Sequence, residues 1–186
     1  MSSQISHDIK GRTKPQDVFY TPKELALLHI DMIDKKWNKD TWCDPCYGEG
    51  VYFDNFPKDG LQNMGYELTK GDDFLTRHRE DILEDVDDNL IIISNPPYSI
   101  LDLWLAKTVE LKPVVFSYLL LQHHITPKRL ERLEKAGYRM TKMKYLKVFK
   151  WYGISVIVEF ELMDEFGGLN NGDDKVDMTY NRTVFR

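Results

Sequence analysis

Short apolar runs alternate with polar, turn-rich segments along much of the chain. The runs 90–93 and 114–121 are rich in β-branched and aromatic residues, which is typical of strands buried on both faces of a sheet. Shorter strands are predicted at 40–44 and 62–66, and helices at 22–33, 51–56, 100–111 and 127–136. The alternation of strands and helices predicts an α/β fold with a mostly parallel, doubly wound sheet.

The last apolar segments, 138–151 and 154–162, predict an antiparallel pair of strands. With 186 residues the chain is expected to form one domain, over residues 15–163. Residues 1–14 are polar and are predicted to be flexible. Residues 164–186 are predicted to be a flexible tail, with one docked segment around Val184 and Phe185.

The composition is that of a globular protein, with 42% hydrophobic residues and no apolar run near the length of a membrane span. Residues 1–10 lack the apolar core of a signal peptide, so we expect an intracellular protein that is not secreted. Cys43 and Cys46 have no second cysteine pair to complete a zinc site, and no metal is expected.

The charge is unevenly distributed along the chain. The formal net charge is -5, yet residues 128–150 hold nine basic and two acidic side chains, a local charge of +7. A basic surface on an acidic protein indicates a polyanionic partner such as nucleic acid. The alternative is a solvated helix face beside a basic edge strand.

The apolar run 90–93 ends in Ser94 and the tetrad Asn95-Pro96-Pro97-Tyr98. Proline cannot continue a strand ladder, so these side chains are expected at the carboxyl edge of the sheet, where ligands bind. The Asn95 and Pro96 carbonyls can together grip one amino group, and the Tyr98 ring offers a flat face to a planar ligand. The alternative is a rigid strand exit without chemistry.

A second candidate site is Asp44-Pro45-Cys46-Tyr47-Gly48-Glu49-Gly50, which follows the strand 40–44. A glycine-rich loop after a strand lets a ligand approach backbone N-H groups. Glu67 follows the next strand, a position from which an acid commonly binds ribose hydroxyls. A carboxylate at Asp44 suits a cationic ammonium group.

The tetrad resembles the catalytic motif of amino-methyltransferases that use S-adenosylmethionine, especially the DNA adenine N6 methyltransferases; glutamine methyltransferases carry similar tetrads. Five signals follow the order of the gamma-ordered adenine enzymes over roughly residues 17–162. They are a Thr-Pro segment at 21–22, the glycine loop, the acid at Glu67, an Asp-Phe pair at 73–74, and the tetrad. The resemblance implies a Rossmann-like methyltransferase fold with an antiparallel last strand.

The resemblance also implies roles for particular residues. The cofactor, S-adenosylmethionine, would be bound by Tyr20, Thr21, Pro22, Asp44, Pro45, Cys46, Gly48, Gly50, Glu67, Asp73, Phe74 and Asn95. Catalysis would rest on Asn95, Pro96, Pro97 and Tyr98, with direct methyl transfer to the N6 amino group of a flipped adenine. Tyr98, Trp151 and Phe149 would contact that base, while Lys128, Arg129, Arg132, Lys142 and Lys144 would hold phosphates.

The family commonly carries a separate target-recognition domain, and only about two dozen residues follow Leu162. The expected partner is DNA, with RNA as an alternative. Without a recognition domain, the enzyme is expected to be weakly specific, to act as a homodimer or to depend on a partner protein. Two other functions remain open. One is protein glutamine methylation, and the other is a non-catalytic subunit that binds nucleic acid.

Overall fold

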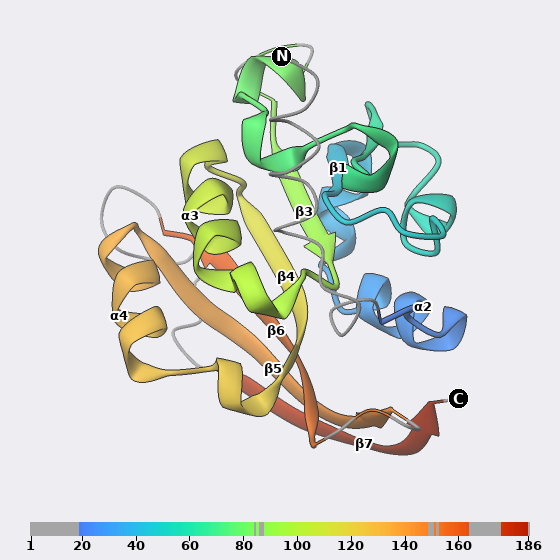
Figure 1. The fold of residues 1–186 in the computed structure, drawn as a ribbon, viewed down its shortest axis with the longest axis vertical. Coiled ribbons are helices and arrows are strands. Elements are labelled where there is room, and N and C mark those ends of the chain that lie inside the picture. Colours follow the sequence, from blue (N-terminus) through green and yellow to red (C-terminus); the bar gives the residue numbers. More distant parts are fainter. Residues whose placement is uncertain are drawn as a thin grey trace.

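The computed structural model describes residues 19–83, 85, 88–148, 151, 153–163 and 176–185. Within these residues a seven-stranded sheet has the order β2-β1-β3-β4-β6-β5-β7 (Figure 1). The strands are β1 (Thr41–Asp44), β2 (Asn63–Gly65), β3 (Leu90–Ser94), β4 (Val115–Leu121), β5 (Tyr138–Val148), β6 (Ser155–Leu162) and β7 (Asp177–Phe185).

Strand direction supports the predicted topology. Neighbours among β1 to β4 pair in parallel, β6 is antiparallel to both β4 and β5, and β7 is parallel to β5. Of the strands in the described part of the chain, β6 alone therefore runs against the others. The expectation of a mostly parallel sheet is confirmed. The expected antiparallel strand is β6, but it is not the last strand, because β7 follows it and runs parallel to β5.

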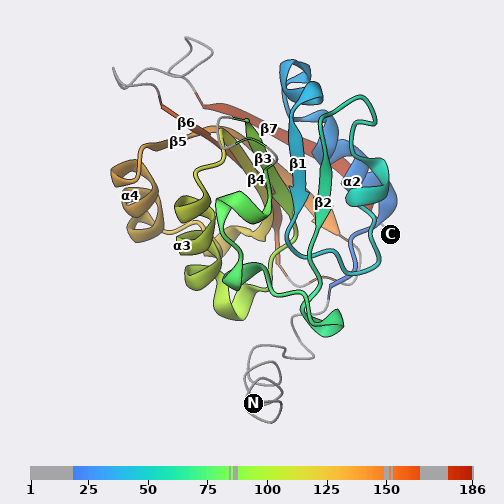
Figure 2. The same cartoon turned by 90° about the horizontal axis from the view of Figure 1, so that it is seen from above.

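Helices cover both faces of this sheet. The helices α3 (Leu101–Leu111) and α4 (Pro127–Lys135) lie on one face, and α2 (Lys23–Asp31) lies on the other (Figure 2). In β3, Ile92 packs in the cluster that contains Trp104 of α3, while Ile91 packs with Ala26 of α2. Successive strand side chains point to opposite faces, so one unbroken apolar run serves both cores. The doubly wound α/β class is confirmed.

Two predicted helices differ from the observed ones. Pro22 occupies the N-cap position of α2, and the Thr21 side chain does not cap the helix. The segment 51–56 holds only a short 3-10 helix, Phe53–Asn55. Phe56 is extended because it precedes Pro57, which disfavours a helical residue before it. The basic helix α4 was predicted correctly, and the Thr126 hydroxyl accepts a hydrogen bond from Arg129 N at its start.

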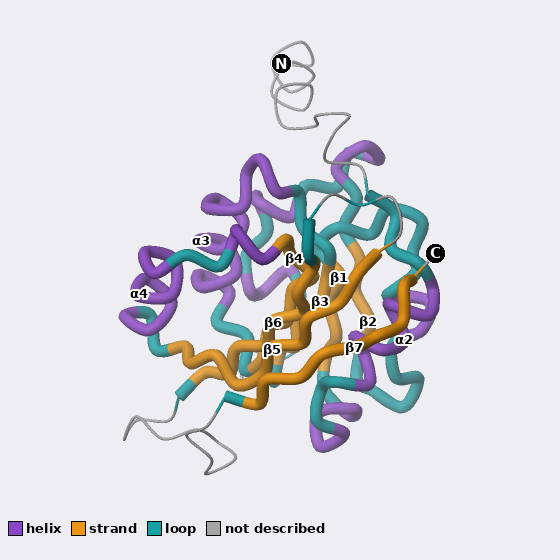
Figure 3. The backbone as a smooth tube through the Cα atoms, turned by 90° about the horizontal axis from the view of Figure 1, so that it is seen from below, coloured by secondary structure: helices purple, strands orange, loops and turns teal. Residues whose placement is uncertain are grey.

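The expectation of a flexible tail is wrong for Asp177–Phe185, which form β7 along the edge of β5 (Figure 3). Phe185 is 6% exposed and packs with Leu146 and Val148 of β5, which explains why this polar segment is ordered. Docking near residue 185 agrees with the prediction. The segments 1–14 and 164–175 lie outside the described residues. Over the part of the chain that is described, no helix is long and apolar enough to cross a membrane.

Candidate active site

A cavity of about 280 Å³ opens where β1, β2 and β3 end. Nine of the residues singled out for cofactor binding line it: Tyr20, Thr21, Pro45, Cys46, Gly48, Glu67, Asp73, Phe74 and Asn95. Pro97 of the tetrad also lines it. Pro22, Asp44 and Gly50 are not among the lining residues. The sheet therefore brings the Thr-Pro segment, the glycine loop, the two acids and the tetrad to one place.

The glycine loop depends on two backbone conformations that side chains rarely adopt. Gly48 has φ of 52° and Gly50 has φ of 81°. A Cβ atom at Gly50 would lie only 2.6 Å from Tyr47 Oη. The carboxylate of Glu67 holds the loop, because its Oε2 accepts from Gly48 N at 2.8 Å while its Oε1 accepts from Thr69 N at 2.9 Å. The backbone amide of Gly48 is therefore fixed at the cavity wall.

Asp44 lies beneath the loop and is completely buried. Its Oδ1 accepts hydrogen bonds from Ser94 Oγ at 2.7 Å and from Cys46 N at 3.1 Å. Its Oδ2 is buried and has no hydrogen-bond partner among the described residues. Burial raises the pKa of this carboxyl to about 7, against the pull of the two hydrogen bonds that lower it. Asp44 is thus poised to ionise when a cation comes close.

Asn95 has its side-chain amide held in one orientation. Its Nδ2 donates to the Phe19 carbonyl at 3.0 Å and to Thr21 Oγ1 at 3.3 Å. Its Oδ1 accepts from Tyr98 Oη at 3.1 Å. The next residue, Pro96, is buried. The tetrad therefore presents an amide oxygen beside an aromatic ring at the cavity wall.

An aromatic cluster lies next to that amide oxygen. The Phe19 ring is stacked on Tyr98, with centroids 6.0 Å apart, and is 5.4 Å from the Trp151 ring. The His124 ring lies 4.7 Å from Tyr98 on another side. Tyr98 and Trp151, both predicted to contact a base, are therefore bridged by Phe19. The other predicted aromatic, Phe149, lies outside the described residues.

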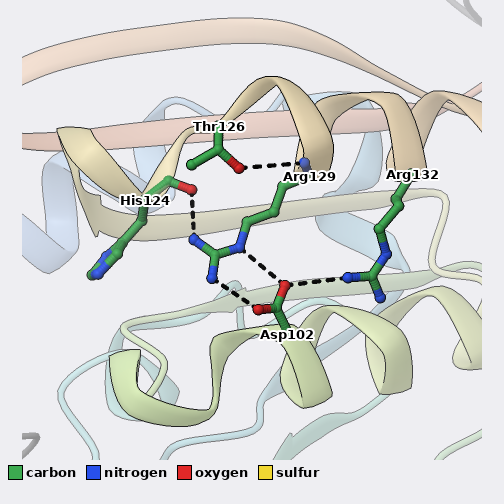
Figure 4. A network of polar contacts seen from close by, with 5 residues as sticks. All are labelled: Asp102, His124, Thr126, Arg129 and Arg132. Atoms are coloured by element: carbon green, nitrogen blue, oxygen red, sulfur yellow. Dashed lines mark hydrogen bonds and ion pairs between the residues drawn. The ribbon is translucent and has the colours of Figure 1, made fainter.

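The predicted phosphate contacts of Arg129 and Arg132 are not supported, because both guanidinium groups face Asp102 of α3 (Figure 4). Arg129 donates from Nε and Nη2 to the two Asp102 oxygens, each at 3.1 Å, and from Nη1 to the His124 carbonyl at 3.0 Å. The Arg129 hydrogen bond is the main cause that lowers the pKa of Asp102. These contacts fasten α4 to α3.

Lys142, also predicted to hold a phosphate, likewise makes contacts within the fold. Its Nζ lies 3.0 Å from Glu159 Oε1 and donates to the Met32 carbonyl at 2.6 Å. Met32 follows α2, so Lys142 lies on the face opposite α4, and alternation along β5 puts Lys144 on the same face. The basic residues of α4 and those at 142 and 144 therefore lie on different faces of the sheet. Lys128, on α4, is exposed.

Several residues of the site were not selected from the sequence. The Tyr52 side chain lines the cavity, and its hydroxyl bonds to the buried ring of His29 at 2.9 Å. A histidine on the buried face of a helix carries no sequence signal of its own. Phe19 directly precedes Tyr20, but only Tyr20 was predicted from the sequence to bind the cofactor. Ile100 and Trp104 complete the apolar wall. Both lie in the segment 100–111, which was predicted as a helix from its apolar periodicity and was given no role in the site.

The sheet order, the paired helical layers and a cavity at the carboxyl edge define a Rossmann-like methyltransferase fold. Among solved structures, a Listeria monocytogenes protein described as a class I S-adenosylmethionine-dependent methyltransferase matches 98% of this chain and 71% of its own, with TM-score 0.63 and 12% identity. A chain described as a modification subunit of a type I restriction enzyme from Vibrio vulnificus matches 87% of this chain and 48% of its own, with TM-score 0.54 and 14% identity.

Similarity in sequence is confined to a short segment. The chain is 38% identical over 56 residues to the type II methyltransferase M.VspI of Vibrio sp.. That segment covers 28% of this chain and 14% of the length of M.VspI. No protein-family model matches the chain.

Proposed function

We propose that this chain is an S-adenosylmethionine-dependent methyltransferase that acts on the exocyclic N6 amino group of adenine in DNA. The observation that carries the proposal is the arrangement of Asn95. Its amide oxygen is held at the cavity wall, beside the Tyr98 ring, by the hydrogen bonds of its own Nδ2. An acceptor next to a flat aromatic face suits an amino group on a planar ring.

The cavity offers suitable partners for each part of the cofactor. Asp44 is buried behind the cavity wall, and its Oδ2 has no hydrogen-bond partner among the described residues. An ammonium group bound nearby would favour the ionised form of this carboxyl. Glu67 is placed for ribose hydroxyls, and Phe74, Leu75 and Ile100 form an apolar wall for a purine ring. When bound, S-adenosylmethionine supplies an electrophilic methyl group.

The chain's own residues would activate the substrate nitrogen. The lone pair of an adenine N6 is delocalised into the ring, so acceptors at Asn95 Oδ1 and the Pro96 carbonyl would draw its protons out of the ring plane and restore its nucleophilicity. The Tyr98 hydroxyl now donates to Asn95 Oδ1, and the amino group would take over that bond. A target base between Tyr98 and Trp151 would displace Phe19.

DNA is the substrate that the comparisons favour. One relative is named a type II methyltransferase, and one structural neighbour is described as the modification subunit of a type I restriction enzyme. Restriction enzymes act on DNA, which favours DNA as the substrate. Lys128 is exposed in the first turn of α4, which follows the carboxyl end of β4, and it offers a cation for a phosphate at that edge of the sheet. RNA and protein glutamine are kept as outcomes of the test.

The test is transfer of labelled methyl from S-adenosylmethionine to duplex DNA, single-stranded DNA, RNA and a protein extract, followed by nucleoside analysis. We expect N6-methyladenine in DNA. Asn95→Ala should lower transfer roughly 100- to 1,000-fold, the cost of removing one main acceptor in a preorganised site. Its affinity for S-adenosylmethionine should stay within a few-fold of the wild type.

The matched control is Asn89→Ala, since Asn89 bonds to Asp40 at the other end of the sheet. That variant should transfer methyl at the wild-type rate. Label in RNA or protein alone would move the reaction to another substrate. A fully active Asn95→Ala protein would remove Asn95 from the catalytic role.

A further inference from the structure

A line of polar side chains runs from Asn95, at the carboxyl edge of the sheet, along the face that α2 covers. Thr21 Oγ1 accepts from Asn95 Nδ2 at 3.3 Å. Thr21 and Tyr52 line the same cavity; burial raises the pKa of the Tyr52 hydroxyl and the Thr21 side chain lowers it, as a hydrogen-bond donor to that oxygen does. Tyr52 Oη bonds to His29 Nδ1 at 2.9 Å, and His29 Nε2 bonds to Ser117 Oγ at 2.8 Å. These residues come from α2, β4, the loops before α2 and after β1, and the turn that follows β3, so only the tertiary structure joins them.

The direction of each hydrogen bond follows from the far end. Ser117 Oγ lies 3.0 Å from the Val158 carbonyl, which can only accept, so the Ser117 proton is used there. His29 Nε2 must therefore donate to Ser117, and Nδ1 carries no proton and accepts from Tyr52. Burial also lowers the pKa of His29 to about 3, so the ring is neutral and has one donor and one acceptor.

The same logic continues to the site. Tyr52 gives its only proton to His29, so its oxygen accepts from the Thr21 hydroxyl, and Thr21 Oγ1 in turn accepts from Asn95 Nδ2. An inverted Asn95 amide would set its oxygen against the Thr21 acceptor and the Phe19 carbonyl. The chain of bonds therefore selects the orientation in which Asn95 Oδ1 faces the substrate.

We propose that His29, Tyr52 and Thr21 form a positioning relay that sets the orientation of the Asn95 amide for methyl transfer. The proposal rests on the function proposed above. His29 is the decisive member because it is fully buried and is not among the residues that line the cavity, so it touches neither cofactor nor base there. Thr21 and Tyr52 line the cavity, so substitutions there would change cofactor binding directly as well as the orientation of Asn95.

The first measurement is the tautomer of His29 by nitrogen NMR on the wild-type protein. We expect the Nε2-H form, with Nδ1 unprotonated. The Nδ1-H form would overturn the relay, because its directions would then be reversed. This readout needs no substrate and no variant.

The second measurement compares His29→Leu with His29→Gln, which keeps one acceptor and one donor. We expect His29→Leu to lower kcat about 5- to 10-fold, the equivalent of one hydrogen bond, with the S-adenosylmethionine Kd unchanged. His29→Gln should recover most of that loss. A folded His29→Leu protein with wild-type kcat, or with an equal loss of cofactor affinity, would contradict a role through Asn95.

The matched control is Thr108→Val, which removes another buried hydrogen bond, at 2.6 Å to Tyr118, on the opposite face of the sheet. It should leave kcat unchanged. The Asn95 side-chain amide signals should shift in His29→Leu and not in Thr108→Val, whatever reaction the protein performs. An unmoved Asn95 signal would defeat the relay, while absence of methyl transfer by the wild type would defeat only the proposed function.

Discussion

At the scale of single residues, Asp44 is fully buried, and the same burial affects both the stability of the fold and the proposed binding of the cofactor. Its pKa of about 7 lies above the ordinary value of 3.8 because the group is taken out of water. A raised pKa means that this group favours folding most below pH 4, and that the contribution is lost as pH rises through about 7. A bound cation would reverse the effect by stabilising the ionised form.

This leads to a prediction for cofactor binding. Between pH 5 and 7, the Kd for S-adenosylmethionine should fall by up to about tenfold per pH unit, because binding requires Asp44 to lose its proton. Above about pH 7 the Kd should level off. Isothermal titration calorimetry across this range measures both the Kd and the proton release. Asp44→Asn should bind more weakly above pH 7 and show no such slope; an unchanged slope would assign the titration to another group.

At the scale of elements, α4 shows that basic residues in a run can form ion pairs within the fold instead of facing a partner. Arg129 and Arg132 form ion pairs with Asp102 of α3, and Lys142 of β5 forms an ion pair with Glu159 of β6. Burial raises the pKa of Glu159 while Lys142 lowers it, so the carboxylate depends on that lysine. The basic stretch thus serves assembly of the fold as well as any partner.

Substitutions of Lys128 and Lys142 should have different effects on DNA binding and on the free energy of unfolding. Lys128→Gln should reduce the slope of log Kd for duplex DNA against log salt by about 1, as one phosphate contact is lost. Lys142→Gln should leave that slope unchanged and lower the free energy of unfolding by about 2 to 4 kcal/mol, since it leaves Glu159 buried and unpaired. Salt titrations and urea unfolding measure the two quantities. The opposite pattern would place Lys142 in the nucleic-acid interface.

For the whole molecule, the sheet is extended at one edge by β7, which returns from the C-terminal region to pair with β5. The strand has few large apolar side chains in its inner face, and Phe185 is the buried anchor that joins Leu146 and Val148. Met178 and Tyr180 are exposed on the other side of the strand. Pairing with β7 covers the edge of β5 and makes β7, a more polar strand, the edge strand on this side of the sheet.

Phe185→Ala should lower the free energy of unfolding by about 3 kcal/mol, the usual cost of removing a buried ring. Met178→Ala, at a position 61% exposed, should change it by less than about 0.5 kcal/mol. Urea unfolding followed by circular dichroism gives both values. Equal stability of the Phe185→Ala protein and the wild type would mean that β7 contributes little to the fold.

Much of the fold was predictable because its signals are local. The run 90–93 is apolar enough to be buried on both faces, and two prolines after Asn95 end the strand wherever it lies. The C-terminal strand was missed because its polar residues lie at an edge, where half of each strand faces water. The single basic surface was wrong because proximity in sequence does not fix the face of a sheet.

The sequence by itself determined the α/β class, the strand ends and the chemical types gathered there, because apolar periodicity and proline act over a few residues. Nine of the twelve residues that it selected for cofactor binding line the cavity. Only the tertiary structure decided which charges are spent within the fold, that Phe19 bridges Tyr98 and Trp151, and that His29 reaches Asn95. These depend on contacts between segments distant in the chain, and burial is also the main cause that shifts the pKa values of Asp44 and His29.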